Sequence, residues 1–256
     1  MLKKKIICLS ICVASLSGAF ARESGAFVGL GGLFGFESNL KASLREEQNG
    51  NNDINDTGKS LAAGGELIAG YNFFFTQRFG IRGYVSGAYS AMFFDKKSIK
   101  LGTSDYVYGS NLNKLTGLVD VNLNLDLMLD IVSSSSFDFG IYAGVGGGFH
   151  FWHGGLMDEV NAIKAQINGS APQAGNNYDV KTQSFFASLT LNAGLTTTIN
   201  SRHSLEISAK IPFLEDPLLR YKTKSQPGAQ QGPNDRQNYL KISMPYSVGL
   251  RYILNF

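Results

Sequence analysis

Ten charged side chains define the chemistry that this sequence could support. Each falls within a stretch of alternating apolar and polar residues, on the face opposite the apolar one. Six acids and four bases gathered on one set of faces could form a structural network of ion pairs, or line a narrow path for ions. The ten residues are Glu66, Arg82, Asp120, Asp126, Asp130, Asp138, Glu206, Lys210, Lys241 and Arg251.

One pair within this set predicts a specific contact. Counting residues across a short polar connection places Asp130 opposite Asp138, with both carboxylates on the same face. Two like charges that close raise the pKa of one carboxyl group or recruit a cation. Arg82 lies near the same end of the adjoining stretch, so we expect it to neutralise the pair.

Other residues with chemical potential form weaker patterns. The glycine-rich run at 144–148 lies inside an alternating stretch with no helix after it, which argues against a phosphate-binding loop. Its small residues are expected to make room for Tyr142, His150 and Trp152. The three histidines, His150, His153 and His203, have no Ser, Asp or Glu neighbour in a recognisable catalytic or metal-binding pattern. We therefore expect no enzyme activity, no metal and no cofactor.

The charged residues are carried by eight stretches with a period of two. From 115 to 131, the odd positions are almost all Leu, Val or Ile and many even ones are Asp or Asn, which is typical of a strand and not of a helix. The eight expected strands are Ala26–Phe36, Ala63–Phe75, Phe79–Phe93, Leu115–Ile131, Phe137–Trp152, Phe185–Ile199, Ser204–Phe213 and Tyr239–Phe256.

The connections between these strands alternate in length. Residues 76–78, 132–136 and 200–203 are short, whereas 37–60, 94–114, 153–183 and 214–238 are long and polar. Short periplasmic turns and long extracellular loops are typical of a bacterial outer-membrane barrel, and aromatic residues near both strand ends fit its two girdles. The sequence therefore predicts an all-β, transmembrane antiparallel β-barrel of eight strands. A hairpin hidden in 153–183 or 214–238 would make ten.

The third long connection contains a different period. Leu156, Val160, Ile163 and Ile167 recur at helical spacing, which predicts a short amphipathic helix. Its apolar stripe would either fold over the barrel mouth as a lid or be offered to a partner or a constriction.

The N-terminal residues have the pattern of a secretory signal peptide. Three lysines at 3–5 precede an apolar run and an Ala-Phe-Ala cleavage site, so residues 1–21 are expected to be a signal peptide and 22–256 the barrel. Cleavage removes both cysteines and three of the 23 basic residues, leaving 20 basic against 20 acidic residues. A balanced charge argues against nucleic acid as a partner.

The two ends of the mature chain resemble a known family. The start Glu23-Ser24-Gly25-Ala26-Phe27-Val28-Gly29-Leu30-Gly31 and the ending Tyr246-Ser247-Val248-Gly249-Leu250-Arg251-Tyr252-Ile253-Leu254-Asn255-Phe256 are similar to the Helicobacter outer-membrane protein family. Tyr252, Leu254 and Phe256 look like the signal read by the barrel assembly machinery. The family includes adhesins and porin-like proteins, and this chain lacks the large cysteine-bearing extracellular domain of the big adhesins.

These patterns lead to a functional expectation. The chain is predicted to be an integral protein of the bacterial cell outer membrane, reached after secretion across the inner membrane, with outer-membrane lipid and the barrel assembly machinery as partners. Its four loops, 37–60, 94–114, 153–183 and 214–238, would contact a host or envelope ligand, with adhesion as one role. The alternative is a narrow porin-like channel through the charged interior.

Overall fold

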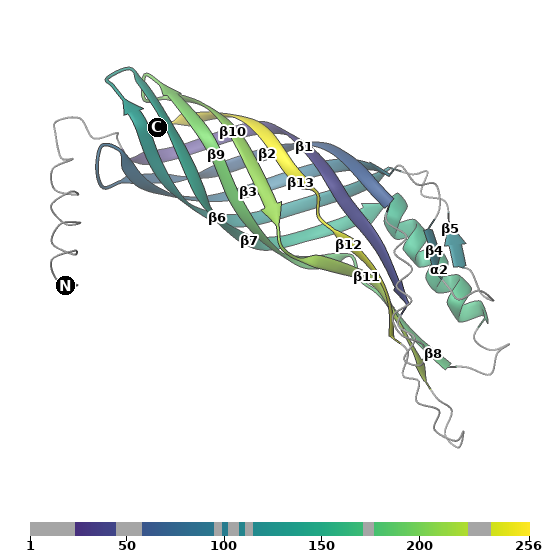
Figure 1. The fold of residues 1–256 in the computed structure, drawn as a ribbon. Coiled ribbons are helices and arrows are strands. Elements are labelled where there is room, and N and C mark those ends of the chain that lie inside the picture. Colours follow the sequence, from purple (N-terminus) through teal and green to yellow (C-terminus); the bar gives the residue numbers. More distant parts are fainter. Residues whose placement is uncertain are drawn as a thin grey trace, which may run out of the picture.

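The protein is a closed antiparallel β-barrel with one helix at its mouth (Figure 1). This computed structural model describes residues 24–44, 58–94, 99–101, 108–110, 115–170, 177–224 and 237–256, and the expected signal peptide lies outside them. The elements are β1 (Gly25–Leu44), β2 (Gly58–Phe74), β3 (Phe79–Phe94), β4 (Ile99–Leu101), β5 (Tyr108–Ser110), β6 (Thr116–Ser133), β7 (Phe137–Gly154), α2 (Gly155–Ser170), β8 (Asn177–Thr182), β9 (Phe185–Ile199), β10 (His203–Pro212), β11 (Glu215–Lys224), β12 (Gln237–Ser243) and β13 (Tyr246–Asn255).

Eight strands close the barrel in the order β1-β2-β3-β6-β7-β9-β10-β13, with β13 pairing back onto β1. Each neighbouring pair is antiparallel, as short hairpin turns require. Because lipid supplies no hydrogen-bond partner to a free strand edge, closure is what allows such a sheet to lie in a membrane. The predicted eight-stranded fold is confirmed.

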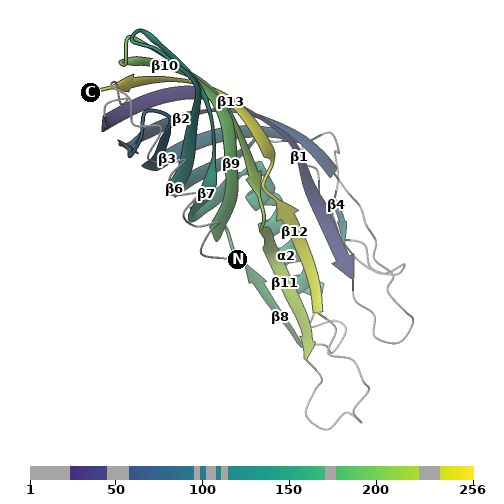
Figure 2. The same cartoon turned by 60° about the vertical axis from the view of Figure 1, so that its left-hand side comes forward.

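Three barrel strands are interrupted near the loop end, as the turned view shows (Figure 2). β8 continues into β9 across residues 183–184, β10 into β11 across 213–214, and β12 into β13 across 244–245. β11 pairs with β8 and β12, and β12 pairs with β1 beyond the end of the β1–β13 ladder. The extra segments within the expected loops therefore lengthen existing barrel strands and add no ninth or tenth.

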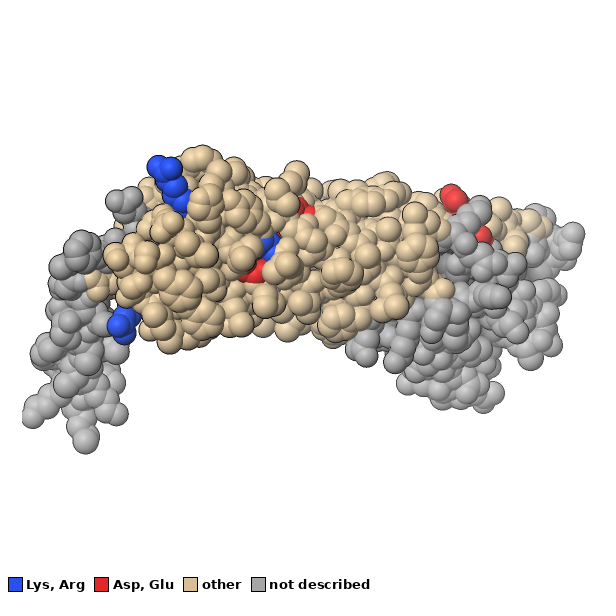
Figure 3. Space-filling view, turned by 90° about the horizontal axis from the view of Figure 1, so that it is seen from above, with Lys and Arg blue, Asp and Glu red and all other residues tan. Residues whose placement is uncertain are grey.

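Alternation assigns the two faces of the wall. On β6, the odd positions from Val119 to Ile131 are exposed and the even positions are buried. Between the two ends of the barrel, the outward positions of the described strands hold no Asp, Glu, Lys or Arg. Figure 3 shows this belt as a mostly tan surface, with basic residues at the short-turn end, acidic ones toward the loop end and a few charged atoms visible at its middle.

The interior is packed in three layers. Near the short turns lie two small apolar clusters, which contain Phe27, Ile68, Tyr84 and Ile253, and Phe74, Met128 and Tyr142. The middle is polar and charged. The loop end holds a larger apolar cluster to which α2 contributes. Among the described residues, no helix combines the length and hydrophobicity needed to cross a bilayer.

Candidate functional site

The middle of the barrel contains a continuous chain of alternating charges. In order, it consists of Asp126, Arg82, Glu206, Arg251, Glu66, Lys210 and Asp120. These residues come from β2, β3 and β6 on one side and from β10 and β13 on the other, and all are buried. Two of the ion pairs, Arg82–Asp126 and Arg251–Glu206, join neighbouring strands, and the others join the two sides across the lumen.

Arg82 is the centre of one half of this chain. Its Nη2 lies 2.8 Å from Oδ2 of Asp126, and its Nη1 lies 2.5 Å from Oε1 of Glu206. Asp126 is the direct register partner of Arg82 on β6, so their side chains leave the wall side by side. The guanidinium carbon also lies 4.4 Å from the ring centroid of Tyr142 and 4.9 Å from that of Tyr84, within the range of cation–π contacts.

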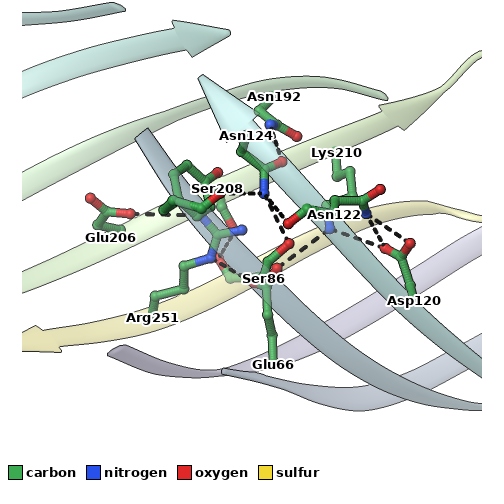
Figure 4. A network of polar contacts seen from close by, with 12 residues as sticks. Glu66, Ser86, Asp120, Asn122, Asn124, Asn192, Glu206, Ser208, Lys210 and Arg251 are labelled. Carbon is green, nitrogen blue, oxygen red and sulfur yellow. Dashed lines mark hydrogen bonds and ion pairs between the residues drawn. The ribbon is translucent and has the colours of Figure 1, made fainter. Parts of the chain in front are cut away.

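Glu66 joins the two cations of the other half (Figure 4). Its Oε2 accepts a 2.7 Å hydrogen bond from Nε of Arg251, and its Oε1 lies 3.4 Å from Nζ of Lys210. Lys210 also reaches Asp120 at 3.3 Å, and the amide of Asn122 donates to both oxygens of that carboxylate at 2.7 Å. Pairing of each buried charge with an opposite one is the condition under which such charges are tolerated.

The glycine run of β7 makes space for this layer. Gly144, Gly146 and Gly148 point inward and lie opposite Asp126, Asn124 and Asn122 on β6. A Cβ at Gly144 would meet the carboxylate of Asp126, and a Cβ at Gly146 or Gly148 would meet the amide oxygen of its Asn partner. The space at these three positions is therefore taken by side chains of β6 and not, as expected, by Tyr142, His150 and Trp152.

Asp130 and Asp138 do not form the expected pair. The β6–β7 register shifts between Asp130 and Val132, which puts Asp130 opposite Gly140 and Asp138 opposite Ser133. Both carboxylates are buried, and Asp138 accepts a 2.7 Å hydrogen bond from Ser133 Oγ. Arg82 is engaged with Asp126 and Glu206 instead. The counting argument was wrong because the chain turns at residues 134–137, where the N–H of Ser134 donates to the carbonyl oxygen of Phe137, so pairing begins at Ser133 and Asp138.

Lys241 also departs from its expected position. It lies on the outer face, where its Nζ is 3.8 Å from Oε2 of Glu215. Met244 and Pro245 are both buried, so two consecutive residues turn inward and the alternation changes phase there. Arg251 keeps the inward phase of β13, whereas Lys241 belongs to β12 and has the opposite one.

The helix α2 closes the loop end of the barrel. Gly154, with a φ of 77°, makes the turn out of β7, and the N–H of Leu156 donates to Thr116 Oγ1. The stripe of Leu156, Val160, Ile163 and Ile167 is fully buried against residues from seven strands of the wall. The lid hypothesis is thereby confirmed.

A hydrogen-bonded cluster beneath this lid was missed by the sequence reasoning. Asp216 of β11 accepts a 2.7 Å hydrogen bond from Nε1 of Trp152, and its Oδ2 lies 2.5 Å from Nε2 of His150. All three side chains are buried. Asp216 lies in an expected loop without periodicity, so no local signal in the sequence relates it to β7. The contact fastens the displaced upper segment of the seventh barrel strand to β7, which lies two strands away in the barrel.

The remaining histidines lie against aromatic rings. His153 stacks on Tyr89 and Phe151, and Nδ1 of His203 lies 2.6 Å from the hydroxyl of Tyr252. Within the described part of the chain, no group of three or more His, Cys, Asp or Glu residues is placed to hold a metal ion. Tyr252 lies on the outer wall of β13 and Phe256 at its end, with Leu254 half-buried between them.

The chain was compared with curated proteins, solved structures and protein families. No curated protein matches the sequence. Solved structures similar to this chain include OprG from Pseudomonas aeruginosa, with 14% identity over 92% of this chain and 98% of that one and a TM-score of 0.45. Another is Ail, the attachment invasion locus protein of Yersinia pestis in complex with sucrose octasulfate, with 13% identity, coverages of 90% and 99% and a TM-score of 0.30.

A family model described as Helicobacter outer membrane protein matches residues 66–256, which include all ten of the charged residues singled out in the sequence. Because this match extends over most of the chain, the protein belongs to the Helicobacter outer membrane protein family and resides in the bacterial outer membrane.

Proposed function

We propose that this protein acts at the cell surface, through the extracellular end of a barrel whose interior is structural. In this proposal the loops 37–60, 94–114, 153–183 and 214–238 contact a host or envelope ligand, and adhesion is the resulting activity. Outer-membrane lipid surrounds the barrel, and the assembly machinery inserts it.

The observation that carries the proposal is the filling of the barrel lumen. Phe27 and Tyr84 pack near the short turns, the charge chain centred on Arg82 and Glu66 crosses the middle, and α2 covers the loop end. An eight-stranded barrel has room for side chains and little else. Transport of a solute through the lumen would require all three layers to move out of its path at the same time.

At its extracellular end, the barrel wall extends further than simple connecting turns between the strands would require. β1 continues eight residues beyond Phe36, about 26 Å along the strand at the usual rise. β8, β11 and β12 extend the same side of the wall, and α2 lies within their curve (Figure 2). In this proposal, the extended rim formed by these strands and α2 is the scaffold on which the protein meets its ligand.

The test combines adherence with conductance. A non-adherent laboratory bacterium displaying the protein should bind cultured epithelial cells, and replacing residues 45–57 or 225–236 with a Gly-Ser linker should abolish that binding. The interior variant Asp120→Asn serves as the control and should adhere like the wild type. The refolded residues 22–256 should leave a planar bilayer silent, with folding verified by a heat-shifted gel band.

Two results would overturn the proposal. Adherence that survives both loop replacements would remove the loops from the function. Reproducible conductance steps whose ion preference changes in Asp120→Asn would favour the channel, because only a conducting lumen is sensitive to that charge.

A further inference from the structure

A pocket of about 350 Å³ opens at the extracellular rim, beside the interruption between β8 and β9. It is lined by Lys164, Val180, Lys181, Thr182, Gln183, Pro217 and Arg220. These residues come from α2, β8 and β11 and from the connection at 183–184. The pocket is therefore created by the tertiary arrangement and by no single element.

Three cations surround this pocket without an acidic partner. Lys181 and Arg220 are direct register partners on neighbouring strands, and both are exposed. Like charges placed opposite each other destabilise a sheet. Lys164 of α2 adds a third positive charge. Among the described residues, no carboxylate lies within ion-pair distance of these three side chains.

A neighbouring cation on the same rim shows the contrast. Lys241 has its own carboxylate, Glu215, at 3.8 Å, and does not line the pocket. Tyr239 lies between the two, with its ring centroid 5.8 Å from the guanidinium carbon of Arg220 and 5.5 Å from Nζ of Lys241. The ring of Tyr239 therefore contacts the guanidinium of Arg220, and the N–H groups of that guanidinium are available to donate to an anion.

The pocket lies just beyond the apolar belt. Phe185, Phe213 and Leu214 are exposed on the outer wall where β9 begins and β10 ends. Lys181 is four residues further along the same strand as Phe185, about 13 Å at the usual rise. An amphiphile whose chains lie against these three apolar side chains would carry its headgroup at the level of the cations.

We propose that this pocket binds the phosphate monoester of an outer-leaflet lipid. Arg220 presents a fork of N–H donors to two phosphate oxygens, Lys181 and Lys164 supply two further charges, and the Thr182 hydroxyl can donate one hydrogen bond. The lipid chains cover Phe185, Phe213 and Leu214. The bound anion relieves the repulsion between Lys181 and Arg220.

The experiment uses the folded residues 22–256 in detergent and measures retained lipid by native mass spectrometry. The probes are phosphatidic acid, which is a phosphate monoester, phosphatidylcholine with the same chains, and inorganic phosphate. The wild type should prefer phosphatidic acid over phosphatidylcholine. A basic residue near an anionic surface contributes about a fivefold preference, so Lys181→Gln/Arg220→Gln should weaken phosphatidic acid binding about 25-fold.

Lys241→Gln is the matched control, because it removes a cation from the same rim but outside the pocket, and it should bind like the wild type. Folding of each variant is checked by its heat-shifted band. Equal binding by wild type and double variant would overturn the proposal, as would a wild type without preference for phosphatidic acid. Displacement of phosphatidic acid by an equal concentration of inorganic phosphate would show that the site takes free phosphate and no lipid.

Discussion

Register decides which charged residues meet inside the barrel. Arg82 pairs with Asp126 because they are direct neighbours across β3 and β6, and its side chain is long enough to reach Glu206 from the far wall. Arg251 and Glu206 are likewise direct neighbours on β13 and β10. The polar layer is thus built from short cross-strand pairs that are then linked through the lumen.

Removing the central cation should be costly. In Arg82→Met, the carboxylates of Asp126 and Glu206 remain buried without their guanidinium, and breaking a buried pair in this way costs about 3–5 kcal/mol. The urea midpoint of the refolded protein, followed by the gel shift, should fall accordingly. Arg78 is an exposed arginine in the adjoining turn, and Arg78→Met should leave the free energy of unfolding within about 0.5 kcal/mol of the wild-type value. A midpoint for Arg82→Met equal to that of the control would show that the charge chain does not stabilise the barrel.

At the scale of elements, the interrupted strands and α2 form one unit. The breaks at 183–184, 213–214 and 244–245 let the upper segments of three strands change direction, and Leu218, Leu219 and Leu240 then pack against the helix. Asp216 holds this arrangement to β7 through Trp152 and His150. An apolar plug at the mouth of the barrel depends on both the helix and the bent wall.

Shortening the apolar stripe of α2 should loosen this plug. Ile163→Ala removes a fully buried side chain, which costs about 2–5 kcal/mol in a packed core. Trp152 is the single tryptophan of the chain and lies in the same cluster, so its fluorescence should shift to the red and become accessible to iodide. Asn161→Ala, on the exposed side of the helix, is the control and should change neither signal. Unchanged quenching in Ile163→Ala would mean that the lid does not depend on this stripe.

At the scale of the whole molecule, the wall separates two opposite environments. Its outward residues form an apolar belt with aromatic side chains near both ends, among them Tyr71 and Phe73 at the short turns and Phe93 and Phe149 at the loops. Its inward residues carry the charges. A soluble sheet would expose the polar face and bury the apolar one, so this inversion requires lipid outside.

The position of the apolar belt in the bilayer can be tested by introducing a single lysine on the outer face. Leu125 lies on the outer face at the middle of β6, and Leu125→Lys should destabilise the barrel by about 2–4 kcal/mol in a bilayer. Ile131→Lys, on the same face of the same strand but next to the short turn, should cost about 0–1 kcal/mol. Urea unfolding from vesicles measures both. Equal costs at the two positions would contradict this placement in the membrane.

The sequence by itself determined the properties that repeat along each strand. Alternation identified all eight barrel strands and their inward faces, except for the segment before Met244, and helical spacing identified the helix over the mouth. Burial against lipid or core imposes a period that is visible in any short window. The predicted boundaries were close, as with Phe185–Ile199, and fell short where β1 and β2 continue beyond the belt and where β8 and β11 extend the wall within expected loops.

Only the tertiary structure decided how the strands meet. The bulge after Asp130 and the change of phase at Met244 and Pro245 each displace side chains by one position, and one position reverses a face. The outward direction of Lys241 follows from such a shift, whereas the pairing of Arg82 with Asp126 and the contact of Asp216 with His150 depend on how separate strands are placed against each other. A period describes one strand at a time, whereas these contacts depend on the register between strands, which the closure of the barrel sets.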